Sequence, residues 1–113
     1  MISLLRFAVI PALLVPAAAG AGQFGLPDDP KELALTCASI LMAGSNNNQM
    51  AGNPADPRID DAANKWLDRS ARLTGKDVNT LLADPDMQAR TAKASDEAFF
   101  PAQEITCRDT APK

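Results

Sequence analysis

The same two-residue pattern occurs three times along this chain of 113 residues, at Asp29-Pro30, Asp56-Pro57 and Asp84-Pro85. An aspartate at a helix N-cap accepts hydrogen bonds from backbone N–H groups that have no partner inside the helix. A proline at the first helical position has no N–H group to leave unsatisfied. The three pairs therefore predict three helix starts. Nothing else in the sequence follows their spacing, so we interpret them as separate helices and not as a repeat.

Apolar residues recur at helical spacing after each of these starts. We expect helices over residues 30–43, 57–73, 77–83, 84–98 and 101–107, the first stopped by Gly44 and the second by Thr74-Gly75. No stretch alternates polar and apolar residues as strands do. The expected fold is all-α, a small four- or five-helix bundle. The residues expected in its core are Leu33, Ile40, Leu41, Ile59, Trp66, Leu67, Leu73, Val78, Leu81, Leu82, Met87, Phe99 and Phe100.

The first 21 residues have the composition of a cleavable secretory signal peptide. Arg6 precedes an apolar run, and small residues follow it, so cleavage is expected before Gly20 or before Gly22. The alternative is an uncleaved membrane anchor, but the apolar stretch is about 16 residues long and a spanning helix needs roughly 20. The expected organisation is a signal peptide over 1–21, a flexible leader over 22–29, a helical domain over 30–107 and a disordered tail over 108–113.

Two cysteines, Cys37 and Cys107, lie outside the predicted signal peptide. In an exported chain such a pair indicates a disulfide, and this one would close the helical bundle. A bond across a loop of about 70 residues stabilises a fold by about 4 kcal/mol in the chain-entropy model. The alternative, a redox-active pair, usually has the close CxxC spacing that is missing here. Export predicts the periplasm, with secretion outside the cell as the other option.

The charge and the missing residue types exclude several classes of function. Without Arg6 the chain has ten basic and fourteen acidic residues, a net charge of −4, which argues against nucleic acid and anionic membranes as partners. The sequence has no histidine and no tyrosine. This removes the histidine-based catalytic sets and the commonest transition-metal ligand. We therefore predict no catalytic residue, no metal site and no cofactor, and a protein that is not an enzyme.

The remaining candidates are residues that a partner protein could contact. They are the polar residues Asn46, Asn47, Asn48, Gln49 and Asn53 of a predicted loop over 45–55, together with Trp66, Phe99 and Phe100. Long loops are often functional, and tryptophan is enriched at the centres of interfaces. Each has a structural alternative. The loop would be a disordered connector, Trp66 would pack in the core, and a chain bent at Pro101 would bury both phenylalanines.

These observations predict a small exported, non-enzymatic protein of the cell envelope that acts by protein–protein interaction, as an adaptor, inhibitor or subunit. The expected partner is another envelope protein, and the sequence gives no oligomeric state.

A first alternative is a periplasmic acid-stress chaperone. Acid neutralises the carboxylates while the basic groups stay charged, so the net charge moves from −4 towards +10 and self-repulsion favours opening. Being small, exported, helical and closed by one disulfide, the chain resembles the HdeA-type acid chaperones in general design, with no shared motif and a different cysteine spacing. A second alternative is a carrier of small apolar ligands, because the expected core is rich in alanine.

Overall fold

The computed structural model describes residues 23–113, so the predicted signal peptide and its cleavage site lie outside the described residues. Within this range the chain is helical and forms no strand, as the sequence predicts. The elements are the single 3₁₀ turn η1 (Gln23–Gly25) and five α-helices: α2 (Pro30–Met50), α3 (Pro57–Thr74), α4 (Val78–Ala83), α5 (Pro85–Ala94) and α6 (Phe100–Asp109).

Aspartate caps begin four of the five α-helices. The three Asp-Pro starts are confirmed: the side chain of each aspartate accepts a backbone N–H bond from the first turn of its helix, and Asp77 does the same for α4. The bonds are Glu32 N to Asp29 Oδ2 at 3.0 Å, Arg58 N to Asp56 Oδ1 at 3.0 Å, Thr80 N to Asp77 Oδ1 at 2.9 Å and Asp86 N to Asp84 Oδ1 at 2.9 Å. These bonds satisfy donors that a helix leaves open at its N-terminus.

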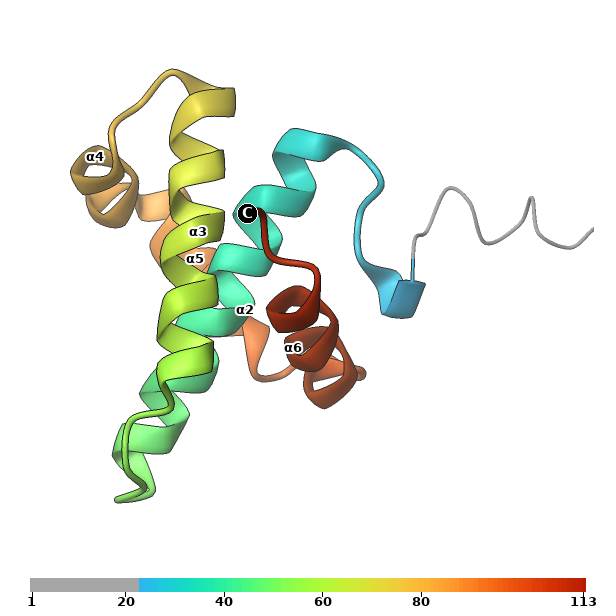
Figure 1. Cartoon of the computed structure of the whole chain (residues 1–113), viewed down its shortest axis with the longest axis vertical. Helices are drawn as coiled ribbons and strands as arrows, with labels where there is room; N and C mark the ends of the chain where they lie inside the picture. The colour runs from blue at the N-terminus through green and yellow to red at the C-terminus, as the bar shows by residue number, and fades with distance from the viewer. Residues whose placement is uncertain (1–22) are drawn as a thin grey trace, which may run out of the picture.

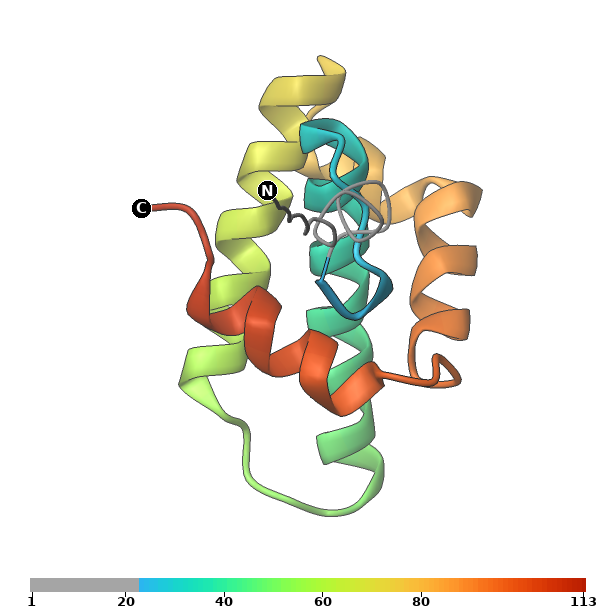
Figure 2. The same ribbon diagram turned by 90° about the vertical axis from the view of Figure 1, so that its right-hand side faces the viewer.

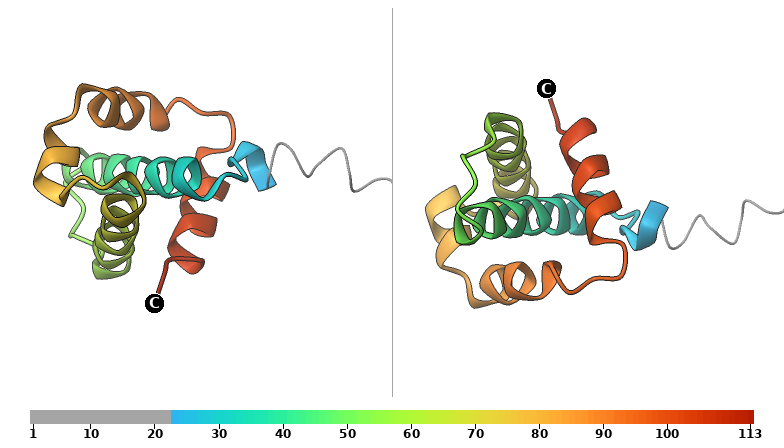
Figure 3. Two further views of the ribbon diagram at one scale, coloured as in Figure 1. Left: turned by 90° about the horizontal axis from the view of Figure 1, so that it is seen from above. Right: turned by 90° about the horizontal axis from the view of Figure 1, so that it is seen from below.

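Helix α2 is the centre of the molecule (Figure 1). Helices α3 and α6 lie on one side of it, and α5 lies on the opposite side (Figure 3). Helix α4 leads from the end of α3 to the start of α5, and α5 stands apart from α3 and α6 (Figure 2). Helix α2 therefore contacts the three other long helices, while α5 packs mainly on α2.

Most of the predicted core is buried. The buried members are Ile40, Leu41, Ile59, Trp66, Leu67, Leu81 and Met87. Leu33, Val78 and Phe100 are partly buried against this cluster. Three predictions are wrong, since Leu73 is 42 %, Leu82 41 % and Phe99 55 % exposed. Leu73 and Leu82 lie near the C-terminal ends of α3 and α4, and Phe99 precedes the first turn of α6.

The predicted end of the first helix at Gly44 is wrong, because α2 continues to Met50. Helix α6 approaches α2 at this glycine, and a Cβ there would overlap the carboxyl group of Glu104. Gly44 therefore permits close helix packing and does not stop the helix. The glycine in the turn after α2 is Gly52, whose φ of 76° lies in the left-handed region.

The last two helices also differ from their predicted bounds. Helix α5 ends at Ala94, four residues early, and α6 runs from Phe100 to Asp109. Between them, short-range bonds from Asp96 N to Lys93 O and from Glu97 N to Ala94 O replace the helical pattern. This tight turn carries the chain from α5 around to the other side of α2, where Cys107 meets Cys37.

Candidate functional site

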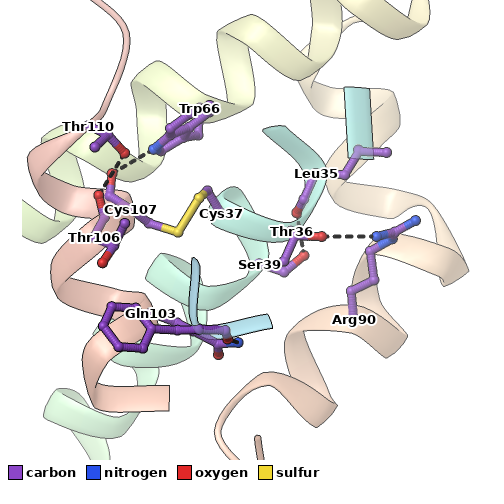
Figure 4. Close-up of a disulfide and its surroundings, with 11 residues drawn as sticks. Leu35, Thr36, Cys37, Ser39, Trp66, Arg90, Gln103, Thr106, Cys107 and Thr110 are labelled. Atoms are coloured by element: carbon purple, nitrogen blue, oxygen red, sulfur yellow. Dashed lines mark hydrogen bonds between the residues drawn. A yellow bond between two sulfur atoms is a disulfide. The ribbon is translucent and has the colours of Figure 1, made fainter. Parts of the chain in front are cut away.

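A disulfide and one buried indole join three helices (Figure 4). The bond between Cys37 of α2 and Cys107 of α6 confirms the predicted pairing, with 5.3 Å between the two Cα atoms. Trp66 Nε1 of α3 donates a hydrogen bond of 2.7 Å to the carbonyl oxygen of Cys107. Because Trp66 is 4 % exposed, it is not available as a surface anchor in this conformation.

The polar residues predicted to form one loop are divided between a helix and a turn. Asn46, Asn47, Asn48 and Gln49 lie in the last two turns of α2, and Asn53 lies in the connection to α3. They are mostly exposed. Asn46 lines a groove, and Asn53 N donates a 2.9 Å hydrogen bond to Asn48 O, which keeps the turn beside the end of α2.

Phe99 and Phe100 point into different surroundings. Phe100 packs partly against the core, whereas Phe99 is exposed and pairs with the ring of Phe24, at 6.0 Å between ring centroids. Phe24 is itself 38 % exposed and has a φ of 55°. A positive φ is unfavourable for a bulky side chain, and such strain gathers at functional positions. No sequence pattern pointed to Phe24, which lies in the segment expected to be a flexible leader.

Two grooves flank α5, one on each side. The first, which we call the α3–α5 groove, has a volume of about 730 Å³ and passes over α2 between α3 and α5. Its apolar lining includes Leu67, Leu82 and Met87, and its polar lining includes Asn46, Asn64 and Gln88. Asp60 is the one charged residue in its lining and already accepts a 3.0 Å hydrogen bond from Ser45 Oγ. This groove is therefore nearly uncharged.

The second groove lies between α5, α2, α6 and the segment of residues 23–29 before α2. We call it the leader groove, and its volume is about 330 Å³. Gly25 and Pro27, the α2 residues Thr36, Ser39 and Ile40, and Gln103 of α6 form one side of it. The opposite side is formed by α5 and Glu97, and it includes both acidic and basic side chains.

Arg90, which lines the leader groove, connects α5 to α2. Its guanidinium group donates to Glu32 Oε1 of α2 at 2.9 Å and to Asp86 Oδ2 of its own helix at 2.8 Å. Burial of Arg90 lowers its pKa, but the hydrogen bonds that it donates to these two carboxylates, together with their negative charge, outweigh burial and leave the pKa raised. On the same interface Ser39 Oγ lies 3.1 Å from Met87 Sδ. Sequence spacing can reveal the Asp86–Arg90 pair, but the Glu32 contact across 58 residues needs the fold.

Three carboxyl groups have shifted pKa values for local reasons. The backbone N–H of Asp86 and then Lys76 lower the pKa of Asp84, while Arg58 lowers the pKa of Asp56. Burial raises the pKa of Glu104 where it packs against Gly44. All three shifts have structural causes, and none indicates acid–base catalysis.

Over residues 23–113, no group of three or more metal-binding side chains is close enough to hold an ion. No helix in that range is long and apolar enough to cross a membrane. The chain matches no protein-family model, no curated protein and no solved structure.

Proposed function

We propose that this chain is a small non-enzymatic protein of the cell envelope that acts by binding another protein through the α3–α5 groove. The observation that supports this most directly is the groove itself, which combines an apolar lining with polar, almost uncharged edges. Protein interfaces have this composition, with charged residues depleted at the centre. The disulfide supports an oxidising compartment such as the periplasm.

The occupant that best fits the groove is an amphipathic helix of the partner. Two helices form the walls and a third lies between them, so an incoming helix would pack as helices do in a bundle. Leu82, which is 41 % exposed at one edge, would be covered by such a helix. Recognition of this kind uses apolar side chains at helical spacing on the ligand.

The test uses a photo-crosslinking amino acid in place of Asn64, an exposed residue at the edge of the groove. The full chain is expressed in its native cells, irradiated, and the crosslinked partners are identified by mass spectrometry. We expect one dominant partner from this position. A crosslinker in place of Asn79, which is exposed on α4 outside the groove, serves as the positional control.

A matched pair of variants on α5 makes the result specific. Ala92 and Ala89 are both exposed, but Ala92 lines the α3–α5 groove and Ala89 lines the leader groove. Ala92→Arg should fill the first groove and abolish the crosslink, whereas Ala89→Arg should leave it. The same crosslink in the Ala92→Arg variant, or no partner at all, would overturn this function.

A second candidate is the acid-stress chaperone, which the attachment of α5 favours. Helix α5 packs mainly on α2, and the ion pair between Arg90 and Glu32 helps to hold it there. In acid the carboxylates of the chain are neutralised while the guanidinium group of Arg90 stays charged, which would weaken this attachment. Acid should then release α5 and expose apolar surface. Dye binding and suppression of client aggregation at pH 3 would support this role, and an unchanged fold at pH 3 would rule it out.

A further inference from the structure

Gln103 of α6 has a buried hydrogen-bond acceptor with no partner among the described residues 23–113. Its side chain is 4 % exposed, and Nε2 donates a 2.9 Å bond to the carbonyl oxygen of Phe24. That bond fixes the orientation of the amide, because a flipped amide would place oxygen against oxygen. Atom Oε1 therefore stays on the other side, buried and unpaired. A buried acceptor without a donor costs free energy that a ligand donor can recover.

The same glutamine lines the leader groove. Arg90 of α5 lines this groove as well. Ile40, Ala89 and Ala94 provide apolar surface beside them. The residue that carries the unpaired acceptor thus lines a groove with apolar walls, which is the usual composition of a binding site.

The charges along the groove balance. The charged residues of its lining are Asp86, Arg90, Lys93 and Glu97, two of each sign. Arg90 is already paired, whereas Lys93 and Glu97 form no ion pair with any residue of the described range 23–113. A balanced lining with one free cation and one free anion suits a ligand that is neutral overall and rich in both donors and acceptors. The polypeptide backbone has this chemistry.

An exposed aromatic pair lies next to the groove. In the lining, Gly25 directly follows Phe24, and Glu97 lies two residues before Phe99. The rings of Phe24 and Phe99 pair with 6.0 Å between their centroids. The unfavourable φ of 55° at Phe24 is maintained although its ring stays partly exposed. Exposed aromatic rings beside a groove give apolar side chains of a ligand a place to pack.

We propose that the leader groove binds a short extended segment of polypeptide from another protein. The Gln103 side chain shifts enough to open Oε1 to the groove, where a backbone N–H of the segment donates to it. A backbone carbonyl of the segment accepts from Lys93, and an apolar side chain packs on the Phe24–Phe99 pair. The α5 wall from Asp86 to Ala94 is about 12 Å long at 1.5 Å per residue. About four residues of extended chain fit along it. This site does not depend on the α3–α5 groove.

The test starts with a displayed library of random seven-residue peptides, selected on the full mature protein with its disulfide intact. Selected peptides should bind native protein and the Ala92→Arg variant equally, and should lose at least tenfold in affinity for Ala89→Arg. Because Ala89 is exposed, this variant keeps the core intact. Failure to select peptides, or equal binding to Ala89→Arg, would overturn the proposal while leaving the α3–α5 groove untouched.

A second measurement tests the glutamine without depending on the fold of one variant. Each backbone N–H of the best peptide is methylated in turn, and affinities are measured for native protein and for Gln103→Met. One methylation should weaken binding to native protein about tenfold, the size expected for one lost hydrogen bond to a buried group. The same methylation should have little effect on Gln103→Met. Equal losses for both proteins would show that Gln103 Oε1 does not contact the peptide.

Discussion

Gly44 lies in the interior of α2 at the point where α6 crosses it, and the carboxyl group of Glu104 occupies the space that a Cβ would need. A glycine inside a helix costs roughly 0.5–1 kcal/mol relative to alanine. The close contact between the two helices compensates for this. One missing side chain on α2 is therefore coupled to one carboxyl group 60 residues later in the sequence.

This coupling predicts opposite effects for one substitution in two backgrounds. In the native chain Gly44→Ala should change the free energy of unfolding by less than about 1 kcal/mol, because the gain in helix propensity is offset by displacement of Glu104. In a Glu104→Ala background the same substitution should stabilise the protein by about 1 kcal/mol. Urea denaturation of the four proteins measures the difference. Equal effects in both backgrounds would show that the two residues are not coupled.

Glu104 also makes the stability depend on pH. Burial raises the pKa of its carboxyl group above the ordinary value of 4.5, so the folded state binds the proton more tightly than the unfolded state. The stability that comes from the protonated form is complete below the unfolded pKa and is lost as pH rises through the folded pKa. Glu104→Gln should therefore be more stable than native protein at pH 7, and this difference should disappear near pH 3. A difference that grows in acid would contradict this sign.

At the scale of helices, the aspartate caps are the features that the sequence predicts best. The aspartate of each Asp-Pro pair accepts a hydrogen bond from a backbone N–H two or three residues later, so its effect does not depend on the rest of the fold. The C-terminal ends of the helices are predicted less well. Gly44 was expected to stop the first helix, but it lies inside α2 and makes room for Glu104 of α6. The grooves were not predicted at all. They depend on how far α5 stands from its neighbours, and contacts such as Arg90 with Glu32 determine this.

Helix α5 should lose its N-terminal stabilisation in acid before the disulfide-linked helices open. The pKa of Asp84 is lowered by the backbone N–H of Asp86 and by Lys76, so its contribution to stability is present above the ordinary value of 3.8 and is lost as pH falls through the folded pKa. From pH 6 to pH 2.5, the amide protection factors, which compare measured exchange with the intrinsic rate at each pH, should fall more in α5 than in α3. Helix α3 has its own aspartate cap with a lowered pKa and serves as the matched control.

The Asp84→Asn variant isolates the charge from the cap. Asparagine caps helices about as well as aspartate but does not titrate. The protection factors of the amides in the first turn of α5 should therefore depend less on pH in this variant than in native protein. Simultaneous loss of protection in α3 and α5 would indicate global unfolding and exclude a separate opening of α5.

At the scale of the whole molecule, the disulfide and Trp66 define which parts stay together. They tie α2, α3 and α6 into one unit, and α5 is attached to the outside of it. Both grooves lie between this unit and α5. Any change in the position of α5 therefore alters both proposed binding sites together, although separate substitutions can block each one.

Removal of the disulfide should destabilise the whole molecule and not one helix. The bond closes a segment of 70 residues, and the chain-entropy model gives about 4 kcal/mol for such a loop. A small domain has a total stability of about 5–15 kcal/mol, so this loss is a large fraction of it. The double variant Cys37→Ala, Cys107→Ala should unfold at a much lower urea concentration than the oxidised protein. It should also lose partner binding at both grooves on warming, because α5 and α6 no longer keep their positions against α2. Unchanged stability in this variant would mean that packing around Trp66 suffices to join the three helices.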